Sequence, residues 1–139
     1  MSEDRGTRIS RLDERIAGCQ RRIGEAREKA ERLDREARAC DEAGGILASW
    51  GQQASGIWQD LHQYVKGDVE WRRLEQEHEE RAAMAAQARN ACLEAHDDLA
   101  RRARREHEDA RDIREEQDNL RRARRECGND GNRRRDPWA

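Results

Sequence analysis

A seven-residue repeat of apolar and small side chains is the feature that most constrains the fold of this chain. The repeat alternates steps of three and four residues without interruption. Its members are Ile9, Leu12, Ile16, Cys19, Ile23, Ala26, Ala30, Leu33, Ala37, Cys40, Gly44, Leu47, Gly51, Ala54, Trp58, Leu61 and Val65. A heptad with apolar a and d positions predicts a helix that pairs along one side with another helix. We call this side of the helix the seam.

The second half of the chain follows a similar repeat with more polar interruptions. Its seam positions are Trp71, Leu74, His78, Arg81, Ala85, Ala88, Cys92, Ala95, Leu99, Ala103, Glu106, Ala110, Ile113, Gln117, Leu120, Arg124 and Cys127. The repeat shifts by one residue between Ala95 and Ala103. We therefore expect a second helix, with a looser contact near Glu106.

A turn is predicted between the halves. Gly67 suits a helix C-terminal cap and Asp68 an N-cap, which leaves arms of about 8–65 and 68–127, each roughly 85 Å long. The sequence therefore predicts an all-α fold: a long antiparallel two-helix coiled-coil hairpin, forming a single helical domain over 1–127. A disordered tail is expected over 128–139. If contacting residues have numbers that add up to about 134, Trp58 lies close to Trp71.

One alternative breaks the first arm near Gly44-Gly45. A glycine inside a helix costs about 1 kcal/mol relative to alanine, so Gly44, Gly45, Gly51 and Gly56 together cost roughly 4 kcal/mol. This alternative has three helices, over about 7–43, 46–65 and 68–127.

Composition limits what else the chain can form. Of 139 residues, 43% are charged and none is Phe, so a large globular core is excluded. Because the seam is mostly alanine, we expect a homo-oligomer or a complex with protein partners to complete the hairpin. No apolar run approaches the roughly 20 residues of a membrane span, and the first ten residues lack the apolar core of a secretory signal. We expect a cytoplasmic protein with reduced cysteines.

The middle of the chain is the first candidate site. Within residues 44–67 only Asp60 and Lys66 are charged, and Trp and Tyr are favoured at binding hot spots. The candidate protein-contact residues are Trp50, Trp58, Tyr64 and Trp71. The alternative interpretation is that these aromatic residues pack the closed end of the hairpin.

Arginine runs form the second candidate site, because arginine clusters on a helix can bind phosphates. The candidate nucleic-acid contacts are Arg101, Arg102, Arg104, Arg105, Arg121, Arg122, Arg124 and Arg125. Acidic residues lie between the two runs, and the net charge is -2. A solvated, ion-paired helix face is the competing interpretation.

Catalysis and metal binding have little support in the sequence. Cys92 and His96 stand four residues apart, and Cys40 would join them in the hairpin, but no fourth ligand and no CxxC pair accompany them. No nucleophile and base are grouped. We expect no enzyme activity, no cofactor and no metal site.

The charged hairpin from Arg11 to Cys127, rich in Arg, Glu and Ala, resembles the FliJ/YscO family, the central-stalk proteins of flagellar and type III secretion export. The resemblance implies that the paired ends, near 9–22 and 114–125, enter a hexameric export ATPase, while the bend meets other export components. A coiled-coil stalk or adaptor is therefore one expected function. The alternative is an arginine-bearing coiled-coil accessory protein, viral or plasmid-borne, that binds nucleic acid.

Overall fold

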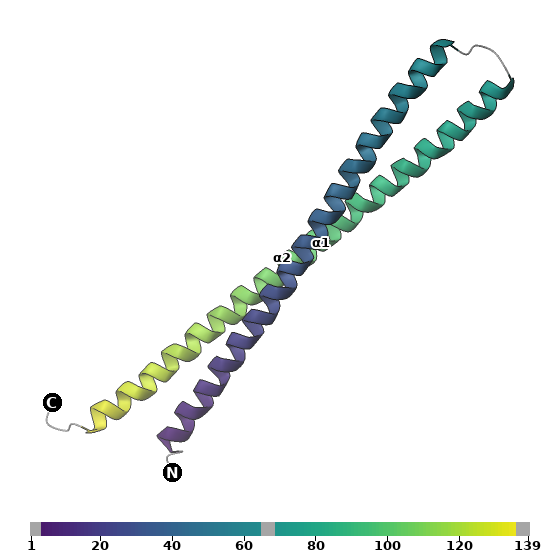
Figure 1. The fold of residues 1–139 in the computed structure, drawn as a ribbon. Helices are drawn as coiled ribbons and strands as arrows, with labels where there is room; N and C mark the ends of the chain where they lie inside the picture. The colour runs from purple at the N-terminus through teal and green to yellow at the C-terminus, as the bar shows by residue number, and fades with distance from the viewer. Residues whose placement is uncertain (1–3, 65–68, 136–139) are drawn as a thin grey trace. The chain divides into compact units, whose positions relative to one another are not determined.

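The computed structural model describes residues 4–64 and 69–135, and all of these except Asp4 are helical. Helix α1 spans Arg5–Tyr64 and helix α2 spans Val69–Arg135 (Figure 1). The chain divides into two compact units. Unit 1 combines residues 1–32 with 102–139, and unit 2 comprises residues 33–101. Each unit pairs a part of α1 with a part of α2, so the predicted all-α helical hairpin is confirmed.

The two helices are antiparallel in each unit. In unit 1, Arg5 contacts Cys127 and Lys29 contacts Glu106. In unit 2, a Cβ atom added to Gly44 would lie 3.6 Å from that of Cys92. The residue numbers of these three pairs add up to 132, 135 and 136, close to the predicted value of 134.

Asp4 caps the start of α1. Its side-chain Oδ1 accepts a hydrogen bond from the backbone N–H of Gly6 at 3.2 Å. Its carbonyl oxygen accepts from the N–H groups of Thr7 and Arg8 at 2.9 and 3.2 Å. The first N–H groups of a helix have no partner within the helix, so an aspartate at this position fixes where the helix begins.

Helix α1 continues through its glycines, so the alternative with a break near Gly44-Gly45 is wrong. Starting a new helix requires a costly nucleus, whereas extending an existing one adds a hydrogen bond for each residue fixed. Gly44 is also buried, and α1 packs against α2 at this position, because a Cβ atom added there would make ordinary van der Waals contact with Cys92. The roughly 4 kcal/mol cost of four glycines is therefore insufficient to stop the helix.

Helix α2 ends at Arg135, beyond the end predicted at Cys127. The guanidinium of Arg5 donates hydrogen bonds to the carbonyl oxygens of Cys127 and Gly128, at 3.1 and 2.8 Å. These bonds hold this part of α2 against α1 past the last seam position. The predicted caps Gly67 and Asp68, and residues 136–139 of the predicted tail, lie outside the described residues.

Unit 1 is closed by small side chains. The buried apolar residues of its α1 part are Cys19, Ile23, Ala26 and Ala30, and those of its α2 part are Ala103, Ala110 and Leu120. Every one of these residues occupies a predicted seam position. Ala30 is 0% exposed, which indicates that the backbones approach closely where alanine faces the partner helix.

Gln117 is the buried polar residue of this seam, at 3% exposure. Its Nε2 donates to the carbonyl oxygen of Ile16 at 3.3 Å and to Oε1 of Gln20 at 3.1 Å. A buried polar group costs free energy unless it is hydrogen-bonded, and here both bonds go to the opposite helix. Gln117 therefore favours one axial register of α2 against α1.

Ion pairs flank the seam of unit 1. Lys29 lies 3.0 Å from Glu106, Arg22 lies 3.6 Å from Glu116, and Arg124 pairs with Asp13. The seam remains closed on both sides of Glu106, where a looser contact was predicted, because Ala103 and Ala110 are buried. Lys29 supplies the opposite charge that allows a carboxylate to occupy this seam position.

Unit 2 is closed only in part. Leu33, Ala37, Gly44 and Trp71 are buried, but the predicted seam positions Gly51, Ala54, Leu61, Leu74, Arg81 and Ala88 are exposed. The seam predicted through residues 44–65 is thus only partly closed: Gly44 and Trp58 face α2, whereas Gly51, Ala54 and Leu61 are exposed. Glycine and alanine have little side chain to bury, and the antiparallel register places Ala54 opposite the charged residues Glu80 and Arg81.

Candidate protein-contact surface

Five large apolar residues of α1 are exposed in unit 2 and lie on one side of the helix. Trp50, Ile57 and Tyr64 recur at seven-residue intervals, with exposures of 63%, 62% and 85%. Ile46 stands four residues before Trp50, and Leu61 stands four residues after Ile57. Residues at such spacings share a helix face. We call these five residues the α1 stripe.

Three further large apolar residues are exposed on α2: Leu74, Met84 and Leu93. Unlike the α1 stripe, these three do not recur at helical spacing. All eight exposed large hydrophobic residues of the described chain lie in unit 2. The exposed apolar surface is therefore concentrated in one unit, and the exposed residues that share one helix face are on α1.

Four aromatic rings join the two helices of unit 2. Trp58 stacks on Trp71 with ring centroids 4.5 Å apart and on His78 at 4.6 Å, while His62 stacks on Trp71 at 5.3 Å. The order His62, Trp71, Trp58, His78 alternates between α1 and α2. We call these four residues the ring column. Offset-stacked aromatic pairs contribute about 0.5–1.5 kcal/mol each beyond the area that they bury, so the column fastens the helices together.

The structure separates the four predicted protein-contact residues into two pairs. Trp50 and Tyr64 belong to the exposed α1 stripe, where an aromatic side chain is available to a partner. Trp58 and Trp71 belong to the ring column, and Trp71 is buried. The second pair thus has the position expected of residues that pack the hairpin, and the first pair has the position expected of contact residues.

The sequence analysis did not single out Ile46 and Ile57, and it placed Leu61 on the seam and not on a contact surface. The available signal was a second apolar repeat beside the seam, within a segment that has one charged residue, Asp60, between Gly44 and Tyr64. The two repeats overlap in the same helix. The seam repeat masks the second one, because it continues the heptad of the preceding forty residues.

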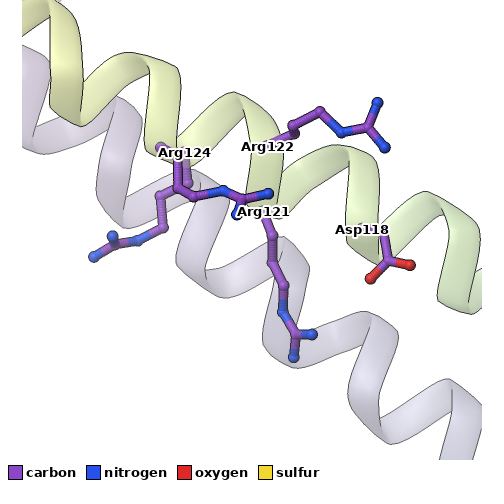
Figure 2. A pocket seen from close by; sticks show the side chains of 5 residues that line it. Asp118, Arg121, Arg122 and Arg124 are labelled. Carbon is purple, nitrogen blue, oxygen red and sulfur yellow. The ribbon is translucent and has the colours of Figure 1, made fainter.

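The second arginine run lines a shallow surface depression of about 540 Å³ in unit 1. Its lining residues are Asp118, Arg121, Arg122, Arg124 and Arg125. The guanidinium groups of Arg121 and Arg122 point away from each other (Figure 2). The hydrogen bond from Arg124 to Asp13, together with the charge of Asp13, raises the pKa of Arg124. Two acidic side chains thus accompany this arginine cluster.

The first arginine run is also exposed, at Arg101, Arg102, Arg104 and Arg105. The Nε of Arg101 donates to the carbonyl oxygen of Asp97 at 3.5 Å. The structure does not bring the eight candidate arginines together in one pocket, because the lining residues of the depression come from the second run alone.

The cysteines and histidines show no grouping in the described chain that could hold a metal ion. All four cysteines are free thiols. A Cβ atom added to Gly44, one helical turn from Cys40, would lie 3.6 Å from the Cβ of Cys92. The Nδ1 of His96 lies 3.2 Å from Oδ1 of Asp97, its neighbour in sequence.

Neither described helix contains a stretch both long and apolar enough to cross a membrane. Comparison with known proteins found no matching family model, no matching curated protein and no matching solved structure. The functional argument therefore rests on the distribution of exposed apolar residues in unit 2 and on the packing that holds each unit together.

Proposed function

We propose that this chain is a non-enzymatic, cytoplasmic helical hairpin that works by binding protein through the α1 stripe. The observation that supports this function most directly is the concentration of all eight exposed large hydrophobic residues of the described chain in unit 2. Contiguous apolar patches on soluble proteins mark interaction sites when they exceed a few hundred Å². Trp50 and Tyr64 would be the aromatic anchors of the contact.

The packing of the two units supports a division of roles. Unit 1 has a closed seam, a satisfied Gln117 and three interhelical ion pairs. Unit 2 buries Leu33, Ala37 and Trp71, stacks the ring column between its helices and leaves eight large apolar side chains exposed to water. In this proposal unit 1 is the framework and unit 2 presents the contact surface.

The resemblance to export stalks gives this proposal a specific form. In that form the hairpin is a stalk or adaptor of a protein-export machine, and its partner is an export ATPase. The antiparallel pairing within each unit and the apolar surface of unit 2 support this form.

The test is affinity capture of the full-length chain from its native cells, run with and without nuclease. We compare the natural chain with the variant Trp50→Glu/Tyr64→Glu. A hot spot of at least 2 kcal/mol corresponds to roughly a 30-fold loss of binding, so we expect at least that fall in the amount of captured protein. Both side chains are exposed, so the melting temperature should stay within about 2 °C of the natural value.

Met84→Glu is the matched control, because Met84 is 68% exposed but lies on α2. It should capture as much protein as the natural chain. Equal losses in the control and in the stripe variant would contradict the assignment of the contact to the α1 stripe.

A second candidate function, binding of nucleic acid, is favoured by the arginine depression in unit 1. Captured material that disappears with nuclease, and that is unaffected by the stripe variant, would support this candidate in place of protein binding. The interleaved acidic residues, among them Asp118 and Asp13, weaken the attraction of this surface for phosphate.

A further inference from the structure

We propose that the partner of the α1 stripe is a second copy of this chain, packed antiparallel about a two-fold axis that passes beside Ile57. This inference rests on the proposed function, because it identifies the occupant of the same surface. Four features of the stripe support it: spacing, charge, orientation and area.

The spacing of the stripe makes it complementary to itself. Trp50 precedes Ile57 by seven residues and Tyr64 follows it by seven. When two antiparallel copies meet at Ile57, each Trp50 faces Tyr64 of the other copy, and Leu61 faces Gln53. A two-fold interface uses the same patch on both subunits. Here the Trp50 ring of each copy meets the Tyr64 ring of the other copy.

The charge of the stripe also fits a second copy. Asp60 is the one charged residue between Gly44 and Tyr64. A strongly acidic or basic partner would find no charge complement on this face, whereas a neutral apolar helix face is what a second copy presents. Charged residues are depleted at the cores of protein interfaces, because burying a charge there removes its hydration.

The orientation follows from Asp60 and from the helix dipoles. In a parallel pair the two Asp60 carboxylates would lie side by side and repel each other. In the antiparallel pair about Ile57, Asp60 faces Ala54, and the two carboxylates are about 9 Å apart along the axis. Antiparallel helices also place opposite dipole ends beside each other.

The area is sufficient for a stable contact. A Trp or Tyr side chain buries about 150–250 Å². With the aliphatic side chains of Ile57 and Leu61, the stripe supplies most of the roughly 800 Å² per partner of a standard interface. The exposed seam positions Gly51 and Ala54 lie beside the stripe and would allow the second helix to approach closely.

Sedimentation velocity of the full-length chain over a range of concentrations tests the dimer. We expect a species of twice the chain mass. Ile57→Lys places two like charges beside the axis and should weaken the dimer roughly 100-fold or more, with circular dichroism unchanged because Ile57 is exposed. Met84→Lys, the matched control on α2, should leave the dimer intact. A dimer that resists Ile57→Lys, or that Met84→Lys breaks equally, overturns the proposal.

Disulfide mapping tests the orientation. Mild oxidation of Ile57→Cys, followed by mass spectrometry of the peptides, should show position 57 of one copy linked to position 57 of the other. Trp50→Cys mixed with Tyr64→Cys should link 50 to 64. Links from 50 to 50 and from 64 to 64 in the separate variants would indicate parallel helices and would overturn the arrangement.

The outcomes separate this inference from the proposed function. A chain that is monomeric at every concentration, yet captures another protein through the α1 stripe, overturns the second copy as partner and leaves the proposed function standing. A chain that neither self-associates nor captures protein overturns both.

Discussion

At the scale of single residues, Gln117 shows how a polar side chain can be retained in a seam that is otherwise apolar. Its amide is buried and donates two hydrogen bonds to α1, to the carbonyl oxygen of Ile16 and to Gln20. Each such bond has a net worth of about 0.5–1.5 kcal/mol. Burying a leucine instead would contribute about 1.5–3 kcal/mol, so Gln117 is not the most stabilising residue for its position.

We therefore expect Gln117→Leu to leave the free energy of unfolding unchanged or to raise it by about 1 kcal/mol. Leucine has no amide to hydrogen-bond with α1, so α2 is no longer held in one axial register. Unit 1 should therefore show extra or broadened amide signals in NMR spectra. Urea unfolding measures the first effect. Gln87→Leu, at an exposed position of α2, is the control and should show neither change. A loss of more than about 2 kcal/mol in Gln117→Leu would contradict this account of the residue.

At the scale of the helices, α1 is continuous although its sequence contains several glycines between residues 44 and 56. Atoms added at the Cβ positions of Gly45, Gly51 and Gly56 would meet no atom within 4 Å. These three glycines therefore have no packing reason to lack a side chain in the helix pair. Their effect on stability is the loss of backbone entropy when the helix forms.

The triple variant Gly45→Ala/Gly51→Ala/Gly56→Ala should accordingly be more stable than the natural chain by roughly 2–3 kcal/mol, because alanine is favoured over glycine by about 0.8–1 kcal/mol at each helical position. Thermal unfolding followed by circular dichroism measures the gain. Ala82→Gly, at an exposed position of α2, should shift the stability the opposite way. A triple variant less stable than the natural chain would mean that this segment is not helical in solution.

At the scale of the whole molecule, the two units differ in how their seams are closed. Unit 1 buries seven apolar seam residues and one glutamine, while the seam of unit 2 is exposed at Gly51 and Ala54. Local opening requires less free energy where few apolar contacts are lost. Stability should therefore be uneven along α1, even though the helix is continuous.

Hydrogen exchange read by mass spectrometry should show this gradient. At a dilution where the chain is monomeric, amides of residues 16–32 should exchange about tenfold or more slowly than those of residues 50–61, as expected for a difference of at least about 1.4 kcal/mol in opening free energy. At higher concentration the second segment should gain protection as the α1 stripe becomes covered. Equal protection of both segments in the dilute chain would contradict the difference between the units.

Much of this molecule could be predicted from its sequence, because a heptad determines which side of a helix meets a partner. The buried positions Cys19, Ile23 and Ala30 were all predicted, and so was the contact of Trp58 with Trp71. The hydrogen-bond partners of Gln117 could not be predicted, since they depend on the axial register of two separate helices.

The candidate surface was harder to predict than the fold. Residues 44–64 contain two neighbouring repeats, one through Gly51 and Ala54 and one through Trp50 and Ile57, and either could have faced α2. The choice depends on the rotation of α1 about its axis, which is set by packing at Gly44 and by the ring column. Sequence periodicity alone gives no information on that rotation.

The ring column also has an optical consequence. Indole rings held 4.5 Å apart and inclined by 12° couple their excited states, so Trp58 and Trp71 should give a paired band in near-ultraviolet circular dichroism that isolated tryptophans lack. One ring belongs to each helix, and the signal therefore vanishes when α1 and α2 separate in unit 2. Trp50 is exposed to water on the α1 stripe, and its fluorescence emission would shift to shorter wavelength when a partner covers it. The protein thus contains two unlabelled spectroscopic probes, one for the parting of its helices and one for the arrival of its partner.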